Sequence, residues 1–313
     1  MLLRQLADPE SSTYTYLLAD EQTRDAVLID PVLEHVDRDL QLVEELGLQL
    51  RYVLETHVHA DHVTAAGELR RRVGAKTVVG AAAGVDCADI AIEDGGAINF
   101  GHLTLEARAT PGHTSGDVTY VLADRSMAFT GDTLLIRGCG RTDFQQGDAR
   151  GLYRSVHDRI FTLPDEALLY PGHDYKGRTV TSVGEERVYN PRLGGNTTED
   201  EFVVKMAELN LAPPKKIEVS LAANTRCGQA AGDTTKVTPP APWAPIERSP
   251  TGIPEVTPQW VSKVMSDNRY IIIDVRQPGE WNDALGHIPE AWLVPLDKLQ
   301  GSATDWDPNT QII

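Results

Sequence analysis

Hydrophobic and polar positions in the first two thirds of the chain change repeatedly between a period of two and a period near 3.6. Short apolar or alternating runs predict strands at 12–19, 26–31, 50–55, 76–79, 102–109, 118–122, 127–129 and 167–170. Helical spacing predicts helices at 33–46, 63–73, 149–160 and 198–209. Gly47 and Gly74 follow the first two helices as C′ residues. The pattern predicts an α/β fold.

Four of these strands are followed at once by histidine or aspartate. The strand at 50–55 runs into Thr56–His62, which reads Thr-His-Val-His-Ala-Asp-His. Three others run into His113, Asp132 and His173, each directly after a glycine that permits a tight turn. Imidazole and carboxylate are common metal ligands, and open α/β sheets place ligands at the carboxyl ends of their strands. We therefore expect one metal centre assembled from four strand ends.

Residue types alone leave two kinds of centre open. His57, His113 and Asp132 can bind one face of an octahedral Fe(II) and leave three positions for other ligands. The alternative is a pair of zinc ions that share Asp132 and activate a hydroxide for hydrolysis. The further ligand-type residues that such a pair would use are His59, Asp61, His62 and His173.

The composition changes near Gly232, where a Pro/Thr-rich stretch without periodicity begins. A chain of 313 residues is long enough for two domains. We predict a first domain at 1–227, a semi-rigid linker at 228–251 and a second domain at 252–313.

Charge and cysteine content narrow the possible partners and the cell compartment. The formal net charge of −17 and the pI near 4.9 argue against a nucleic-acid partner. No apolar run approaches the roughly 20 residues of a membrane span, and the N-terminus carries no leader pattern. The three cysteines are Cys87, Cys139 and Cys227, an odd number that argues against a disulfide framework. We expect a cytoplasmic protein without a membrane partner, and the sequence is compatible with a homodimer.

The motifs at the strand ends together resemble the metallo-β-lactamase superfamily, which implies an αββα sandwich with the metal at one edge of its two sheets. Two further stretches resemble the persulfide dioxygenases of that superfamily. The glyoxalase II enzymes, also similar, are expected to carry a longer helical C-terminal region. The motifs are Thr56–His62, Pro111–Thr114, Gly131–Thr133, Pro171–His173, Ile136–Gly147 and Tyr189–Leu193.

The resemblance implies one Fe(II) per chain, held by His57, His113 and Asp132 as the metal-binding and catalytic residues. It places the other ligand-type residues in a second layer that orients these three; they are His59, Asp61, His62 and His173. The implied reaction converts glutathione persulfide, O₂ and water into sulfite and glutathione. A glyoxalase II-like thioester hydrolase with a binuclear site is the alternative. A carrier with a structural metal is disfavoured, because structural zinc sites are closed by four ligands.

Glutathione carries two carboxylates, so basic groups should line its cleft. Arg141 and Arg192 can each pair a carboxylate bidentately. Tyr175 can donate to the peptide, and Asn190 is a further candidate. Cys139, inside a Gly-Cys-Gly turn, is predicted to be structural.

The stretches Tyr270–Arg276 and Gly286–Ala291 resemble the first half of a rhodanese domain, with Glu290 where a glycine is usual. His287 is predicted to be a turn and packing residue. The chain stops at the strand that leads into the catalytic cysteine loop of rhodaneses, so we expect a partial rhodanese-like domain here. In a complete chain this domain would exchange sulfur between thiosulfate and glutathione, as a sulfurtransferase fused to the dioxygenase.

Overall fold

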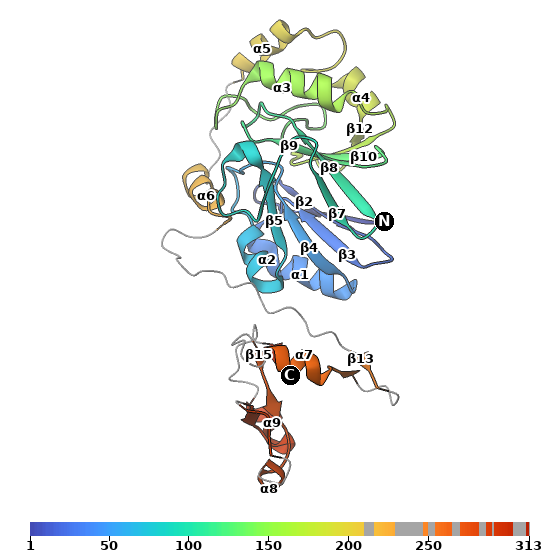
Figure 1. Ribbon diagram of the computed structural model, residues 1–313. Helices are drawn as coiled ribbons and strands as arrows, with labels where there is room; N and C mark the ends of the chain where they lie inside the picture. Colours follow the sequence, from blue (N-terminus) through green and yellow to red (C-terminus); the bar gives the residue numbers. More distant parts are fainter. Residues whose placement is uncertain are drawn as a thin grey trace. The chain divides into compact units, whose positions relative to one another are not determined.

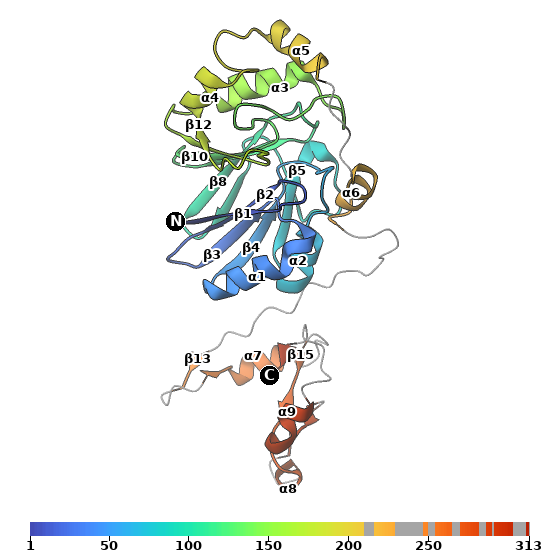
Figure 2. The same cartoon turned by 180° about the vertical axis from the view of Figure 1, so that it is seen from behind.

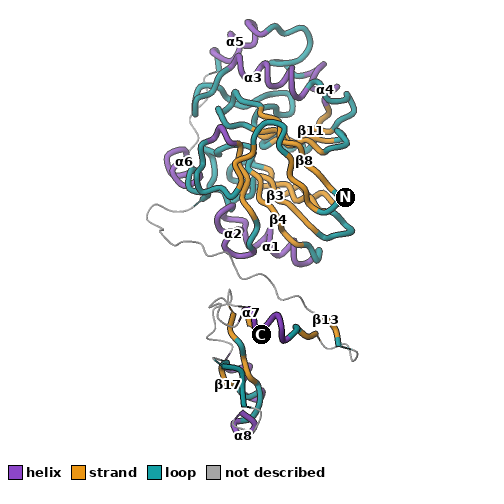
Figure 3. Tube along the Cα trace, viewed as in Figure 1, coloured by secondary structure: helices purple, strands orange, loops and turns teal. Residues whose placement is uncertain are grey.

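The computed structural model describes residues 1–209, 216–228, 247–249, 254–264, 270–281, 286–289, 291–302 and 311–312. The chain divides into two compact units, Met1–Lys236 and Val237–Ile313. The boundary falls inside the predicted linker, most of which lies outside the described residues. Figure 3 shows strands gathered at the centre of the first unit and helices outside them.

Two sheets form the middle of the first unit, each with six strands in the part of the chain that the structure describes. The first sheet has the order β1(Leu2–Ala7), β2(Tyr14–Ala19), β3(Asp25–Ile29), β4(Gln49–Leu54), β5(Lys76–Gly80) and β6(Ile90–Ile92). The second has the order β12(Thr181–Ser182), β11(Leu168–Pro171), β10(Met127–Gly131), β9(Val118–Leu122), β8(Leu103–Ala109) and β7(Ala97–Phe100). Strands β3 to β6 pair in parallel, and so do β10 and β11.

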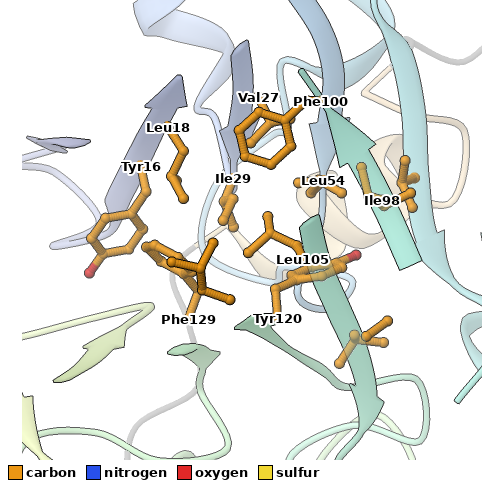
Figure 4. Packing of buried hydrophobic residues seen from close by; sticks show 14 of the residues in the cluster. Tyr16, Leu18, Val27, Ile29, Leu54, Ile98, Phe100, Leu105, Tyr120 and Phe129 are labelled. Atoms are coloured by element: carbon orange, nitrogen blue, oxygen red, sulfur yellow. The ribbon is translucent and has the colours of Figure 1, made fainter. Parts of the chain in front are cut away.

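The core between the two sheets is aromatic and aliphatic. Leu18, Val27 and Leu54 come from the first sheet, and Phe129 and Tyr120 come from the second (Figure 4). All five side chains are fully buried. Burial of this apolar surface is the main force that holds the sheets face to face.

Helices cover the outer face of each sheet (Figures 1 and 2). Against the first sheet, α1(Val36–Glu45) and α2(Ala66–Val73) bury a second apolar core that includes Val43 and Leu69. Against the second sheet, a third core includes Leu152, Val183 and Phe202. The helices that supply it are α3(Ala149–Ser155), α4(Val183–Tyr189) and α5(Glu199–Ala207). The four layers confirm the predicted αββα sandwich.

Local signals place several helix ends. Gly47 and Gly74 have φ of 61° and 70°, the left-handed conformation predicted for C′ residues. Thr198 and Glu201 form a capping box at the start of α5. The helix predicted at 63–73 begins later, because α2 starts at Ala66, whereas 149–160 is helical throughout, as α3 followed by a π-helical turn at Val156–Ile160.

One disulfide joins Cys87 to Cys227 across 140 residues of sequence. The expectation that the cysteines stay unpaired is therefore wrong for this pair. The signal was missed because the two residues lie on distant segments without a spacing pattern. Cys139 is free and buried, in keeping with the predicted structural role.

The second unit contains short parallel strand pairs. β15(Tyr270–Ile271) pairs with β18(Gln311–Ile312), and β16(Ile273–Asp274) pairs with β17(Trp292–Leu293). The indole of Trp281 stacks on His287 with ring centroids 3.8 Å apart, as expected for a packing histidine. Glu290 lies outside the described residues. Within the described residues, every helix is too short or too polar to cross a membrane.

Candidate metal centre

The four strand ends predicted from the sequence meet at one edge of the two sheets. Strand β4 leads into the loop that carries His57, while β8, β10 and β11 lead to His113, Asp132 and His173. Ligand atoms of His57, His113 and Asp132 all lie within 4.8 Å of one another. These three residues are called the triad below. The donor types and their spacing fit a divalent metal ion.

The two histidines of the triad are each held through Nδ1. Nδ1 of His57 lies 3.0 Å from Oγ1 of Thr56, and Nδ1 of His113 lies 2.7 Å from the carbonyl oxygen of Arg141. Such bonds fix the orientation of a ligating ring and leave Nε2 for a metal. Burial, together with the nearby imidazoles of His59 and His113, lowers the pKa of His57 well below its usual value. The neutral form, which binds metal, is thereby favoured.

The carboxylate of Asp132 is held by His173. Nδ1–H of His173 donates to Oδ1 of Asp132 at 2.7 Å, and Oδ2 lies 3.7 Å from Nε2 of His113. Burial alone would raise the pKa of Asp132, but the charge and hydrogen bond of His173 lower it below its usual range. The hydrogen bonds of the triad thus run through Nδ1 of both imidazoles and Oδ1 of Asp132, on the side away from the atoms expected to bind a metal.

His59 is engaged by buried carboxylates behind the triad. Its Nε2 lies 3.2 Å from Oδ1 of Asp30 and 3.4 Å from Oε2 of Glu55. Burial by itself would lower the pKa of His59, but these two acids raise it well above the usual value. Asp30 also accepts from the backbone N–H and the hydroxyl of Thr56. The predicted supporting role of His59 is compatible with this geometry.

Asp61, His62 and His173 form a second hydrogen-bonded group beside the triad. Oδ2 of Asp61 lies 2.9 Å from Nδ1 of His62 and 3.1 Å from Nε2 of His173. The hydroxyl of Thr13 donates to the same oxygen at 2.9 Å. Both ring nitrogens of His173 are thus occupied, one by Asp132 and one by Asp61.

A second grouping of ligand atoms is nevertheless close enough to hold an ion. Atoms of His59, Asp61 and His62 also lie within 4.8 Å of one another. Nε2 of His62 and both ring nitrogens of His59 are buried without a hydrogen-bond partner among the described residues. The ligand atoms and their distances therefore leave room for the binuclear alternative as well as for a single ion.

A cavity of about 630 Å³ opens beside the triad. It is lined by all three triad residues and by several basic side chains. Four of the basic side chains already pair with carboxylates: Arg137 with Glu186, Arg141 with Asp143, Arg178 with Asp174 and Lys216 with Glu10. Their charge is therefore largely compensated within the protein.

Arg192 and Lys176 line the same cavity with no carboxylate partner in the described part of the chain. Arg192 donates from Nη1 to the carbonyl oxygen of Cys139 at 3.1 Å, which fixes its position. Lys176 is exposed at the cavity. These two cations are available to an anionic ligand, and Lys176 was not predicted from the sequence.

Two predicted ligand contacts also line the cavity. Arg141 lies over the ring of Phe144 at 4.1 Å and pairs with Asp143 at 2.7 Å. The ring of Tyr175 stacks on His173 with centroids 5.9 Å apart, and its side chain is 72% exposed. Both are positioned to contact a molecule in the cavity.

Asn190 has a different position from the other three predicted substrate contacts. It is buried and is not among the residues that line the cavity. Its amide donates to the carbonyl oxygen of Gly138 and to Glu186, and its Oδ1 accepts from the backbone N–H of Arg192. Its contacts therefore shape the loop that carries Arg192, and this geometry gives no support to a direct substrate contact.

Sequence reasoning missed several residues around the centre: Thr13, Asp30, Glu55, Lys176 and Asn224. Asp30 and Glu55 follow or end predicted strands, in the same way as the predicted ligands, and that position was the available signal. Thr13 and Asn224 reach the site only through the tertiary fold.

Comparison with known proteins matches two families. The model of the metallo-beta-lactamase superfamily matches residues 8–173, and that of the rhodanese-like domain matches residues 257–313. The chain is 57% identical over 229 residues to the human protein "Persulfide dioxygenase ETHE1, mitochondrial", covering 73% of this chain and 89% of that protein.

Solved structures show the same likeness. The crystal structure of ETHE1 from Myxococcus xanthus has a TM-score of 0.71 and 55% identity, and the match covers 73% of this chain and all of that one. A metallo-beta-lactamase from Staphylococcus aureus has a TM-score of 0.68 at 20% identity, covering 100% of this chain and 90% of that one. The latter match shows the fold alone.

Proposed function

Since this chain belongs to the metallo-beta-lactamase superfamily, as a persulfide dioxygenase with a rhodanese-like domain, we propose that it oxidises glutathione persulfide at one Fe(II) held by the triad. The overall reaction is glutathione persulfide plus O₂ plus water giving glutathione plus sulfurous acid, which balances in atoms and electrons.

The hydrogen bonds around the triad are the observation that supports a single metal ion. A second ion would take up Asp61, whose Oδ2 already bonds Thr13, His62 and His173, and His173 is in turn bound to Asp132. It would also compete with Asp30 and Glu55 for His59. In the triad, one ligand atom of each residue lies within 4.8 Å of the other two. Two nitrogens and one carboxylate oxygen are the facial set of non-haem Fe(II) oxygenases.

When bound, Fe(II) supplies the redox chemistry with O₂ at positions that the triad leaves open. The protein's own residues prepare that site. Thr56 and the Arg141 carbonyl hold the two imidazoles in orientation, and His173 holds the carboxylate of Asp132. Preorganisation of this kind lowers the free-energy cost of assembling the reacting geometry.

The cavity supports glutathione as the carrier of the persulfide. Glutathione has two carboxylates, and Arg192 and Lys176 are the two lining cations without a carboxylate partner among the described residues. A net charge of −17 makes such local cations necessary for an anionic substrate. The hydroxyl of Tyr175 and the guanidinium of Arg141 lie on the same cavity and are proposed as peptide contacts.

The rhodanese-like domain is consistent with sulfur transfer, and thiosulfate is the proposed donor. In a complete domain, thiosulfate plus glutathione would give sulfite plus glutathione persulfide. Both activities on one chain raise the local concentration of the labile persulfide at the iron site. A cytoplasmic location and a homodimer remain predictions from the sequence.

Oxygen uptake with synthetic glutathione persulfide tests the proposal. We expect uptake with sulfite as the product, and loss of uptake in Asp132→Ala. The glyoxalase II-like alternative is favoured by the close grouping of His59, Asp61 and His62. It predicts hydrolysis of S-lactoylglutathione without oxygen uptake, and that result would replace the proposed function.

A further inference from the structure

The structure assigns to Asn224 the role of a positioning residue for the metal-binding loop. Asn224 is the last residue of α6(Ile217–Asn224), outside the stretch matched by the superfamily model, and its side chain is buried. The inference rests on the proposed function only in assuming that the triad binds a metal. Figure 1 shows α6 at the side of the first unit. In the sequence, α6 comes near the C-terminal end of that unit.

One side-chain amide satisfies three backbone groups of the loop. Nδ2 of Asn224 donates to the carbonyl oxygens of His59 and His62, both at 2.8 Å. Its Oδ1 accepts from the backbone N–H of Thr64 at 2.9 Å. The two donors and the acceptor of the amide are therefore all used on one loop.

The loop needs such a partner because it is irregular and buried. Residues 56–63 form no helix or strand, and the side chains of His57, His59 and His62 are almost fully buried. Buried backbone carbonyls outside helices and sheets need hydrogen-bond donors from elsewhere in the protein. Each carbonyl left unpaired costs roughly 1–3 kcal/mol. Asn224 supplies these donors from 165 and 162 residues away in the sequence.

The segment that carries Asn224 is itself fixed to the loop's exit. The backbone N–H of Gly67 donates to the carbonyl oxygen of Cys227 at 2.9 Å. Gly228 has φ of +81°, and a Cβ there would lie 2.1 Å from the carbonyl oxygen of Thr64. The disulfide from Cys227 to Cys87 ties the same segment to the connection between β5 and β6.

Asn224 affects the metal centre indirectly, through side chains that the loop carries. The clamped stretch carries Asp61, which bonds His173, and His173 bonds the triad carboxylate of Asp132. It also follows directly on His57. Loss of the amide donors should therefore free the loop backbone and loosen the groups that orient the triad. Substitution of residues that orient metal ligands typically lowers metal affinity by about 10–100-fold.

Two variants separate the donors from the volume of the side chain. Asn224→Ala removes all three bonds, while Asn224→Asp keeps the shape and the acceptor for Thr64 but removes both donors. Ser220→Ala is the matched control, because Ser220 is a buried residue of the same helix whose Oγ has no hydrogen-bond partner among the described residues. All three are made in the full chain.

Metal release and amide exchange are the measurements. The Fe(II)-loaded proteins are mixed anaerobically with a chelator, and hydrogen exchange of the peptide that spans 57–67 is followed in the metal-free proteins. We expect both Asn224 variants to release iron about 10–100-fold faster and to exchange faster in this peptide. Ser220→Ala should match the wild type in both measurements. The electron paramagnetic resonance signal of the nitric oxide adduct should change only in the Asn224 variants.

Wild-type release and exchange rates in both Asn224 variants would overturn the inference. Equal changes in Ser220→Ala would also overturn it, because they would point to a general effect of α6. If the wild type held zinc and consumed no oxygen, the proposed function would fail. The release of that zinc and the exchange of the 57–67 peptide would still decide the role of Asn224.

Discussion

Nδ1 of His173 lies 2.7 Å from Oδ1 of Asp132, while Nε2 of the same ring lies 3.1 Å from Asp61. One imidazole thus bridges a triad ligand and the loop that carries His57. A second metal ion could bind this ring only if one of these two bonds were released. In this chain both nitrogens of the His173 ring are bonded to carboxylates. The proposal of a single iron ion depends on these two bonds.

Replacing His173 tests this arrangement. His173→Gln removes the charge and shortens the reach of the bridge, so Asp132 loses its fixed orientation. We expect iron affinity and oxygen uptake to fall about 10–100-fold, with saturated iron still at one ion per chain. Titration of the metal-free protein with Fe(II) measures the affinity. A wild type with two ions per chain that falls to one in the variant would identify His173 as a ligand instead.

Removing the two available cations should weaken substrate binding without affecting the metal. Hydrogen bonds to charged groups contribute about 1.5–3 kcal/mol, so Arg192→Met and Lys176→Met should each raise KM for glutathione persulfide about tenfold or more. The effect should shrink as salt is added. Steady-state oxygen uptake gives kcat and KM separately.

Lys76→Met is the control for these variants, because Lys76 is exposed at the start of β5 and does not line the cavity. It should leave KM unchanged. A fall in kcat with unchanged KM in Arg192→Met would place Arg192 in loop support through Cys139 rather than in substrate binding.

The strand-end positions explain how much of this site the sequence could predict. His57, His113, Asp132 and His173 each follow an apolar run and a turn signal, so their convergence follows from how sheets are built. Helix ends marked by Gly47 and Gly74 were equally visible because their left-handed conformation is a local property.

Contacts made by distant segments were not predictable in this way. Asn224 reaches the loop through α6, and the pairing of Cys87 with Cys227 joins segments with no common spacing. Asn190 shows a second limit of local patterns. Its motif suggested a ligand contact, but the fold buries it against Gly138 and Glu186. Local sequence patterns indicate which residues have a functional or structural role. They do not indicate which groups each of these residues contacts.

The disulfide predicts a definite thiol count. Protein unfolded in denaturant without reductant should take up one alkylating group, on Cys139, and three after reduction. Cys87→Ser should lower the free energy of unfolding by about 2–4 kcal/mol, because the cross-link restricts the unfolded chain. Mass spectrometry gives the count. Three groups added before reduction would show that the pair is not formed in the purified protein.

Acid should remove one stabilising contact near the N-terminus. Burial alone would raise the pKa of Asp8, but hydrogen bonds from Ser11 and His35 lower it to about 2 from 3.8. The folded state therefore gains stability from this carboxylate above pH 3.8 and loses it as the pH falls through about 2. Asp8→Asn should lower the free energy of unfolding at pH 6 by on the order of 1 kcal/mol, since His35 is partly exposed.

Denaturant unfolding of both proteins at several pH values measures this effect. The difference between wild type and Asp8→Asn should narrow steadily as the pH is lowered toward 2. A difference that stays constant with pH would show that Asp8 acts by its shape and not by its charge.

The metal content of the chain purified under anaerobic conditions tests the central claim most directly. We predict about one iron per chain, with little zinc, as expected for a facial set of two histidines and one carboxylate. The iron should be lost in Asp132→Ala. Two zinc ions per chain in the wild type would contradict the account and would make the centre a hydrolytic one.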